Sequence, residues 1–324
     1  MGDRSFLGLV ALGMGAVMGL GAWFYRTDGL PARWGPEVAA HAAASQDFLQ
    51  DRSRCRVPQG GAFAGQEVCA IGPEGGTPRV LIWGDSHLRA LMDGLALAAD
   101  EAGVPGLILW RAGCPPAFGL QKRESAATPA EDAACPASVE AVARALEQSP
   151  GIGLVVLVGR WAYYATGTGA GQDGQNRIAL APRPGSGLPE GLSQADLLAV
   201  ALARTVEALR AGGREVVLLR QVPELPRYDS RAVARGLAHG RIAPGEVPGL
   251  MVPDTGRAAA ADAALEQAEA AGARRLDPWP GLCDPSCGIG PDGAVSWFDT
   301  NHLTNAGARR LVPLLVPLLR EAGR

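Results

Sequence analysis

The chain has 324 residues, of which 47% are hydrophobic and 19% charged, and its formal net charge at pH 7 is −3. This composition supplies enough apolar side chains for a packed core and excludes an intrinsically disordered chain. No run of five like charges occurs, so a basic surface for nucleic acid is missing and a nucleic-acid-binding protein is excluded as well.

The first predicted element is an apolar helix at the N-terminus. Residues 5–25 carry no charge, and at about 1.5 Å per residue they span the roughly 30 Å hydrocarbon core of a bilayer. Residues 23–26, Trp-Phe-Tyr-Arg, end the run as an interfacial aromatic belt followed by a charge. We therefore predict that residues 1–27 are a retained membrane anchor. The alternative is a signal peptide cleaved near the small residues 19–21.

The segment after this helix is predicted to be a linker. A short helical stretch is predicted over residues 37–49, and residues 58–78 are rich in Gly and Pro. We therefore predict that residues 28–77 form a linker and lead-in, and that residues 78–324 form the catalytic domain.

Beyond residue 78, short apolar runs alternate with longer Ala- and Leu-rich stretches. Such runs are typical of parallel strands buried on both faces, and their alternation with helices predicts an α/β fold with a parallel sheet. The predicted strands are Arg79–Trp83, Gly106–Trp110, Gly153–Val158, Glu215–Arg220 and Arg274–Leu276. The predicted helices are His87–Ala102, Pro136–Gln148, Ser193–Ala211, Thr255–Ala271 and Asn305–Ala322.

Proline and glycine modify this pattern in two places. Pro313 and Pro317 are expected to kink or shorten the last helix, because proline removes a backbone donor and clashes with the preceding turn. Residues 166–189 are rich in Gly, Pro and polar side chains, which predicts a mobile surface loop.

The six cysteines fall into three pairs that are close in sequence. Local disulfides account for this pattern; zinc binding is the alternative, although only four histidines are present and none stands at finger-like spacing. Disulfides behind a membrane anchor indicate an oxidising compartment. We therefore predict a single-pass protein of the bacterial inner membrane with its main domain in the periplasm. The predicted disulfides are Cys55–Cys69, Cys114–Cys135 and Cys283–Cys287.

A serine follows the first strand of the predicted sheet, at the start of a helix. The strand leads directly into Gly84-Asp85-Ser86-His87. In open α/β sheets ligands bind at the carboxyl ends of the strands, and the N–H groups of a helix N-terminus stabilise developing negative charge. Ser86 is therefore a candidate nucleophile. The alternative is that Asp85 or Ser86 only caps the helix.

An acid and a histidine precede the last predicted helix, in the run from Asp299 to Leu303. A neutral histidine accepts the proton of a serine hydroxyl, while a carboxylate holds the other ring nitrogen in the required tautomer. Asp299 and His302 are thus candidates for the acid and base of a catalytic triad. The alternative is a capping turn with Asp299 or Asn301 as the cap.

Together the two motifs resemble those of the SGNH hydrolase superfamily, and closely resemble its branch found as the extracytoplasmic C-terminal domain of acyltransferase family 3 proteins. Three further segments fit this branch: Cys114-Pro115, Arg160-Trp161 with nearby Tyr163, and Val222-Pro223-Glu224. The resemblance covers roughly residue 78 to the C-terminus. It implies a three-layer, doubly wound, flavodoxin-like fold with Ser86 as nucleophile, His302 as base and Asp299 as the acid that orients the base.

The expected oxyanion site departs from the superfamily. In the superfamily a glycine and an asparagine bind the oxyanion together with the N–H of the serine. Here Gly113 can stand for the glycine, alongside the N–H of Ser86. The segment after the third predicted strand, where the superfamily has its asparagine, reads Arg160-Trp161 instead. The side chain of Arg160 or the indole N–H of Trp161 is a candidate replacement donor. The alternative is that these two side chains only shape a pocket wall.

The remaining histidines have no predicted catalytic role. His87 is expected to pack or bond within the first helical turn rather than to act as a second base, and His41 and His239 are expected at the surface. No P-loop lysine motif is present and the Met and Trp positions are scattered, so no metal and no cofactor are predicted.

The resemblance implies acyl transfer, with acetyl as the expected group, from an acyl-Ser86 intermediate to a hydroxyl of a cell-surface glycan or a lipid. The family's usual multi-helix membrane domain is missing from a chain with one predicted span, so a transferase would need a separate multi-span acyl carrier as its donor source. A carbohydrate acetylesterase is the first alternative, because water can replace the sugar hydroxyl at the acyl-enzyme. A non-catalytic glycan-binding or scaffolding domain is the second, since the asparagine is missing.

Overall fold

Four strands rich in Val, Leu and Ile, together with a shorter fifth strand, form the parallel part of one sheet in a computed structural model, which describes residues 3–27, 29, 33–283 and 287–323. The strands are β3 (Val80–Gly84), β4 (Gly106–Trp110), β6 (Leu154–Val158), β8 (Glu215–Leu219) and β9 (Arg274–Leu276). Their spatial order is β4-β3-β6-β8-β9. The connections therefore run first to one side of β3 and then to the other, and β3 and β6 meet at the point where ligands bind doubly wound sheets.

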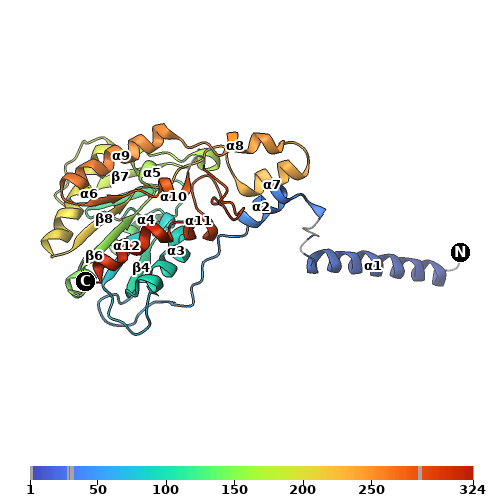
Figure 1. Cartoon of the computed structure of the whole chain (residues 1–324), viewed down its shortest axis with the longest axis horizontal. Helices are drawn as coiled ribbons and strands as arrows, with labels where there is room; N and C mark the ends of the chain where they lie inside the picture. Colours follow the sequence, from blue (N-terminus) through green and yellow to red (C-terminus); the bar gives the residue numbers. More distant parts are fainter. Residues whose placement is uncertain (1–2, 28, 30–32, 284–286, 324) are drawn as a thin grey trace.

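Helices cover both faces of this sheet, which gives the predicted three-layer α/β fold (Figure 1). One face packs against α3 (Ser86–Ala102), α11 (Asn305–Arg309) and α12 (Val312–Ala322), and the other against α4 (Pro129–Glu147), α6 (Gln194–Ala211) and α9 (Thr255–Ala270). Side chains alternate along β3, so Val80 and Ile82 enter the first core while Leu81 and Trp83 enter the second. The near-continuous apolar runs of the strands follow from burial on both faces.

Residues 28–77, predicted as linker and lead-in, contribute three elements to the fold. Strand β2 (Val68–Ile71) pairs antiparallel with β4, and β1 (Cys55–Arg56) pairs antiparallel with β2. Helix α2 (Pro36–Ala44) lies further upstream. The sheet is consequently mixed at this edge. Strands this short inside a Gly/Pro-rich segment lack a sequence pattern of their own, and the neighbouring strand edge supplies their hydrogen bonds.

The prediction of a mobile loop at residues 166–189 is wrong, because this segment contains regular structure. Strand β7 (Ile178–Pro182) pairs antiparallel with β5 (Leu120–Glu124) in a second, two-stranded sheet, and the short helix η2 (Gly171–Asp173) precedes it. Ladder hydrogen bonds to β5 order β7 even though its own composition is unremarkable. Helix α5 (Trp161–Thr166) leads into this region.

Helix α4 begins at Pro129 and not at the predicted Pro136. Thr128 and Glu131 form a capping box: the Thr128 hydroxyl accepts from the Glu131 N–H at 3.3 Å, and the Glu131 carboxylate accepts from the Thr128 N–H at 2.8 Å. This cap starts the helix early enough that Pro136 falls in its interior. The last predicted helix is interrupted between Arg309 and Val312, as the prolines led us to expect. The remaining helices are α7 (Ser230–Ala238), α8 (Val247–Leu250), α10 (Trp279–Leu282) and η3 (Pro244–Glu246).

The N-terminal helix α1 (Asp3–Arg26) extends away from the domain (Figure 1). Its residues 4–26 have a mean hydropathy of 1.8 over the most apolar window, and none of that window is buried against the rest of the chain. The helix therefore has the length and composition of a membrane span.

His41 was predicted at the surface, but it is only 1% exposed. Helix α2 packs against α7, and the His41 Nδ1 lies 2.9 Å from the hydroxyl of Tyr228. Burial lowers the pKa of His41 to about 4. His239, by contrast, is exposed as predicted.

The six cysteines form the three predicted disulfides, Cys55–Cys69, Cys114–Cys135 and Cys283–Cys287. The first joins directly opposed residues of β1 and β2. The second ties the loop after β4 to helix α4, and both of its cysteines are buried. The zinc alternative fails for these cysteines because a disulfide sulfur is not a thiolate ligand.

Replacing both Cys114 and Cys135 by Ser is expected to destabilise the protein by about 3 kcal/mol, because the bond closes a loop of 21 residues in the unfolded chain. Thermal unfolding followed by circular dichroism measures the effect. The matched control is the double Ser variant of Cys283 and Cys287, whose separation is 4 residues and whose loss should cost less. Equal melting temperatures for the parent and the Cys114/Cys135 variant would contradict the expectation.

Candidate active site

Ser86 stands at the junction of β3 and α3, as predicted. Asp85 is the N-cap of α3, and its Oδ1 accepts a hydrogen bond from the His87 N–H at 2.8 Å. Gly84 is required before it, because a Cβ at this position would lie 2.1 Å from the carbonyl oxygen of Val158 on β6. The partly exposed Ser86 side chain is thus presented at the carboxyl end of the central strand, over the first turn of a helix.

The structure brings Ser86, His302 and Asp299 together. His302 Nε2 lies 2.9 Å from Ser86 Oγ, and His302 Nδ1 lies 2.8 Å from Asp299 Oδ2. The other oxygen of Asp299 accepts from the backbone N–H groups of Asn301 and His302. The alternative that Asp299 or Asn301 caps the last helix is wrong, because the N-cap of α11 is Thr304. This geometry is the hydrogen-bonded relay that a serine nucleophile requires.

The loop that carries Asp299 and His302 is held on both sides. Trp297 is fully buried and its indole donates to the carbonyl of Pro223 at 2.9 Å, while Leu303 bridges back to Trp297. Thr304 then caps α11 through the N–H of Gly307. The positions of the acid and base are consequently set by core packing.

The carboxylate and the imidazole shift each other's pKa. Burial alone would raise the pKa of Asp299, but the facing His302 and three hydrogen bonds lower it to about 2. Burial alone would lower the pKa of His302, but the charge and hydrogen bond of Asp299 outweigh it and raise this pKa above its usual 6.5. Asp299 therefore stays ionised at neutral pH and favours the imidazolium form of its partner.

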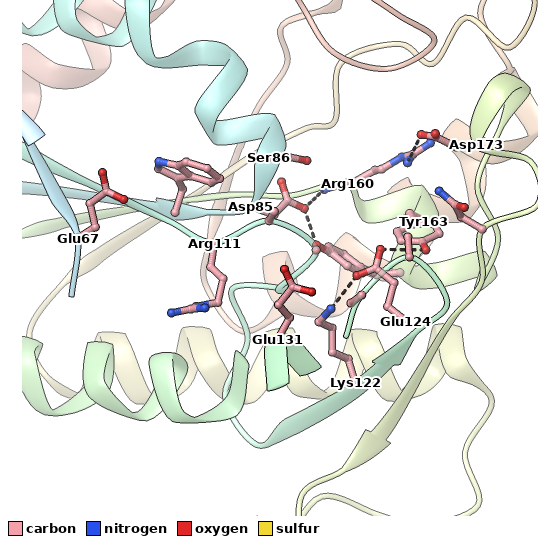
Figure 2. A pocket seen from close by; sticks show the side chains of 17 residues that line it. Glu67, Asp85, Ser86, Arg111, Lys122, Glu124, Glu131, Arg160, Tyr163 and Asp173 are labelled. Atoms are coloured by element: carbon pink, nitrogen blue, oxygen red, sulfur yellow. Dashed lines mark hydrogen bonds and ion pairs between the residues drawn. The ribbon is translucent and has the colours of Figure 1, made fainter. Parts of the chain in front are cut away.

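A polar cavity of about 490 Å³ opens beside Ser86 (Figure 2). Charged and aromatic side chains line it: Glu67, Arg111, Lys122, Glu124, Glu131, Arg160 and Asp173, with Trp110, Tyr163 and Tyr164. Gly113 also lines the cavity, with a φ of +61°. Its Cβ would lie 2.3 Å from a carboxylate oxygen of Glu124, so a glycine is needed there.

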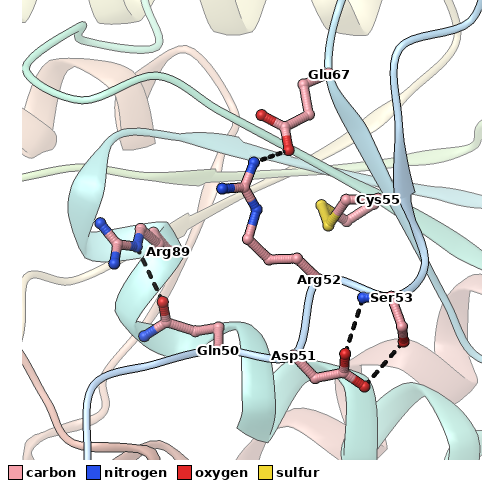
Figure 3. Close-up of a disulfide and its surroundings, with 8 residues drawn as sticks. Gln50, Asp51, Arg52, Ser53, Cys55, Glu67 and Arg89 are labelled. Carbon is pink, nitrogen blue, oxygen red and sulfur yellow. Dashed lines mark hydrogen bonds and ion pairs between the residues drawn. A yellow bond between two sulfur atoms is a disulfide. The ribbon is translucent and has the colours of Figure 1, made fainter. Parts of the chain in front are cut away.

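One cluster among the described residues has the spacing of metal ligands, namely Cys55, Glu67 and Cys69. Both cysteine sulfurs are in a disulfide, and the Glu67 carboxylate is paired with Arg52 (Figure 3). These groups are therefore committed to one another and do not suit a metal ion.

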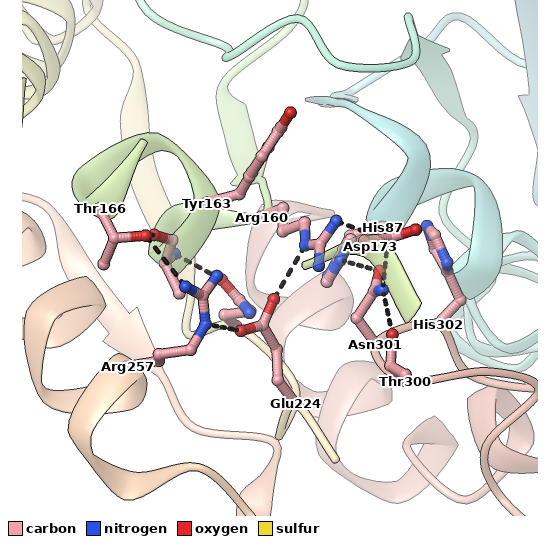
Figure 4. A network of polar contacts seen from close by, with 12 residues as sticks. His87, Arg160, Tyr163, Thr166, Asp173, Glu224, Arg257, Thr300, Asn301 and His302 are labelled. Carbon is pink, nitrogen blue, oxygen red and sulfur yellow. Dashed lines mark hydrogen bonds and ion pairs between the residues drawn. The ribbon is translucent and has the colours of Figure 1, made fainter. Parts of the chain in front are cut away.

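Two carboxylates hold the side chain of Arg160, the first of the two predicted replacement donors (Figure 4). Its Nε donates to Glu224 at 2.8 Å and its Nη1 donates to Asp173 at 3.0 Å. Burial alone would lower the pKa of Arg160, but these ion pairs raise it, so the guanidinium remains charged. Its Nη2 is buried with no hydrogen-bond partner among the described residues, and Arg160 lines the same cavity as Ser86.

Trp161 is excluded as the predicted replacement donor. Its indole N–H donates to the carbonyl of Leu219 at 2.8 Å, and the side chain is fully buried. The alternative that Trp161 shapes a pocket wall is not met either, because Trp161 packs in the core and does not line the cavity beside Ser86.

His87 is buried, and its Nε2 lies 3.2 Å from the side-chain oxygen of Asn301. Burial, reinforced by the positive charges of His302 and Arg160, holds the pKa of His87 well below 6.5. Its side chain therefore bonds across to the loop of the acid and base, and not within the first helical turn as expected. Asn301 was considered only as a cap, and its bonds to His87 and Asp173 had no sequence signal.

The chain matches the family described as "SGNH domain (fused to AT3 domains)" over residues 54–317. It belongs to this family. Membership supports acyltransferase or esterase activity in general, and the fusion that defines the family suggests a membrane acyltransferase domain as partner. The match begins upstream of β1, so it includes the antiparallel strands at the sheet edge.

Solved structures are similar to this chain at low sequence identity. The periplasmic domain of a lipopolysaccharide acetyltransferase from Salmonella ser. Paratyphi A is 15% identical, with 75% of this chain and 84% of that one covered and a TM-score of 0.49. A GDSL-like lipase from Bacteroides thetaiotaomicron is 13% identical, with 78% and 92% covered and a TM-score of 0.39. No curated protein matches the chain significantly.

Asp299→Asn is expected to lower the pKa of His302 to below 6.5, because the charge that raises it is removed while the burial that lowers it remains. Titration of the imidazole protons by NMR measures this shift. Asp292→Asn is the matched control, since Asp292 is exposed and caps only the N–H of Ala294. An unchanged His302 titration in Asp299→Asn would contradict the coupling.

Proposed function

We propose that the protein is a membrane-anchored serine acyltransferase of the periplasm, which transfers an acyl group through an acyl-Ser86 ester to a hydroxyl of a cell-surface glycan. The observation that carries this proposal is the contact between Ser86 Oγ and His302 Nε2, which lie 2.9 Å apart. Ser86 also lines the polar cavity to which Arg160 contributes, so a nucleophile that is bonded to its base stands beside a charged side chain.

In the first half-reaction, Ser86 Oγ attacks the carbonyl carbon of the acyl donor and its proton passes to His302 Nε2. Asp299 stabilises the resulting imidazolium. The N–H groups of Ser86 and Gly113 and the Nη2 of Arg160 bind the oxyanion. The tetrahedral intermediate then expels the donor's alcohol or thiol, which takes the proton from His302, and the acyl group remains on Ser86.

In the second half-reaction, a glycan hydroxyl gives its proton to His302 and attacks the acyl carbon. The oxyanion forms again in the same place and collapses with release of Ser86, which recovers the proton from His302. The cavity beside Ser86 suits a sugar, because its wall carries both hydrogen-bond donors and acceptors together with aromatic rings. Arg160 takes the role of the missing asparagine, and its full charge gives a stronger hydrogen bond than an amide.

The membrane placement follows from two features of the described residues. Helix α1 is long and apolar enough to cross a bilayer, and three disulfides lie behind it. Disulfides persist in the periplasm and not in the cytosol, so we place α1 in the bacterial inner membrane and the domain on the periplasmic side. A multi-span acyl carrier of the membrane is the proposed donor source, in keeping with the family's fusion to AT3 domains.

A carbohydrate acetylesterase is the second candidate. The side chain of His302 is 24% exposed, so water can reach the base and attack the acyl-Ser86 ester in place of a sugar hydroxyl. Release of free acetate from an acetylated sugar by the purified full-length protein, with no transfer to added glycan, would favour this candidate.

Ser86→Ala is expected to leave the melting temperature unchanged and to lower turnover of p-nitrophenyl acetate by a factor on the order of 10⁴ or more, because Ser86 is the hydroxyl that is bonded to His302. A serine-directed phosphonate should label Ser86 in the parent and fail to do so in His302→Ala. A fully active Ser86→Ala protein, or a parent that no phosphonate labels, would point instead to the non-catalytic glycan-binding or scaffolding alternative.

Arg160→Lys is expected to lower kcat by about 10² to 10³, because the charge remains but the Nη2 donor is lost. The matched control is Arg220→Lys: Arg220 is likewise held by two carboxylates, those of Asp262 and Asp277, but it does not line the Ser86 cavity. Steady-state kinetics and thermal unfolding of both variants separate catalysis from folding. Similar losses of kcat in both variants would contradict the role of Arg160.

A further inference from the structure

A second cavity, of about 230 Å³, also adjoins Ser86. Ser86 lines both cavities, whereas His302 lines only the smaller one and Arg160 only the larger one. The Arg89 guanidinium, on the wall of the smaller cavity, lies 5.5 Å from the ring of Trp110, on the wall of the larger one. The Arg89–Trp110 stack therefore lies between the two cavities beside the serine.

The walls of the smaller cavity are mainly apolar. The rings of Phe48 and Phe298 lie 4.4 Å apart, and Ala90 and Leu303 complete the carbon surface. The polar side chains on the wall are engaged with one another: Arg89 Nε donates to Gln50 Oε1 at 2.9 Å (Figure 3), and Asp299 holds His302. A ligand in this cavity thus meets aromatic and aliphatic carbon close to the reacting oxygen.

The Phe48 side of the cavity comes from the segment that follows α2. Asp47 accepts hydrogen bonds from the backbone N–H groups of Asn305 and Ala306, and the side chain of Asn305 donates to the carbonyl of Leu49 at 2.9 Å. Residues on both sides of Phe48 are therefore tied to the first turn of α11. This turn follows His302 closely in sequence, so the wall and the base are held by one short segment.

We propose that this second cavity is the acyl-chain subsite, and that Phe48 and Phe298 set the length of the acyl group that the protein transfers. The inference rests on the proposed function, since it assumes an ester at Ser86. A sugar placed here would set most of its hydroxyl groups against a mainly apolar wall, which is unfavourable, whereas the polar cavity offers more donors and acceptors for them. An acyl chain has only carbon beyond its carbonyl, so burial against the two rings is favourable.

The size of the cavity extends this inference to the acyl chain itself. An acetyl group has a single methyl to place beyond the carbonyl, which fills little of a space of about 230 Å³. The subsite accordingly accepts a short chain longer than acetyl, such as butyryl. Each additional methylene that enters the cavity should raise kcat/KM roughly fourfold until the cavity is full.

The experiment compares acyl chains of different length on a constant leaving group. The full-length protein in detergent is assayed with p-nitrophenyl acetate, butyrate and hexanoate. The parent is expected to prefer butyrate over acetate by roughly 16-fold, since butyrate has two more methylenes. Phe298→Ala should raise the ratio of hexanoate to butyrate turnover, and Phe298→Trp should lower the ratio of butyrate to acetate turnover. Phe48→Ala should act in the same direction as Phe298→Ala.

Leu49→Ala is the matched control, because Leu49 adjoins Phe48 in sequence but is 70% exposed and does not line the cavity. It should keep the chain-length preference of the parent. A parent with no preference for butyrate, or a preference that neither Phe298 variant changes, would overturn the assignment of the subsite.

Phosphonate labelling separates this proposal from the proposed function. Ethyl and hexyl phosphonates that share one leaving group are reacted with the parent and with Phe298→Ala, and labelling of Ser86 is followed by mass spectrometry. Chain-dependent labelling that Phe298→Ala alters supports the subsite. Labelling that is independent of chain length overturns the subsite and leaves the serine enzyme standing, whereas no labelling by either reagent overturns both.

Discussion

The site around Ser86 depends on a positive charge kept inside the protein. Arg160 is only 7% exposed, and an unpaired charge at such a depth would cost several kcal/mol. Glu224, from the segment after β8, and Asp173, from η2, supply the compensating charges. Because the two carboxylates occupy Nε and Nη1, Nη2 is left without a partner among the described residues, in a side chain that lines the serine's cavity.

The carboxylates that balance the charge of Arg160 also connect Arg160 with the loop that carries the acid and the base. Asp173 accepts from the side chain of Asn301 as well as from Arg160, and Asn301 in turn lies against His87 (Figure 4). The loop of the acid and base is thereby bonded to the residue proposed to bind the oxyanion. Glu224 also pairs with Arg257 at the start of α9, which extends the network to the far side of the sheet. Movement of one member would be felt by the others, since each makes more than one charged or buried hydrogen bond.

Much of the fold and of the candidate site could be predicted from the sequence, because each of these strands and motifs is a contiguous segment. The strands β3, β4, β6 and β8 are continuous apolar runs, and Ser86, Asp299 and His302 lie in short motifs at element boundaries. What could not be predicted depends on contacts between distant segments. β7 exists through its pairing with β5, and Asp173 lies in a stretch whose glycines indicated a mobile loop. The bonds of Asn301 and the burial of His41 likewise depend on what packs against them.

The close approach of β3 and β6 at Gly84 fixes one dimension of the site. Since β3 and β6 touch there through main-chain atoms, no rotamer change can alter the gap between them. The nucleophile follows Gly84 by two residues on one strand's continuation, and Arg160 follows Val158 by two on the other's. The backbone N–H of Arg160 also donates to Asp85 at 2.8 Å. The separation of the backbones that carry Ser86 and Arg160 is therefore set by the scaffold. Redesign of the cavity walls for other substrates can leave this separation unchanged.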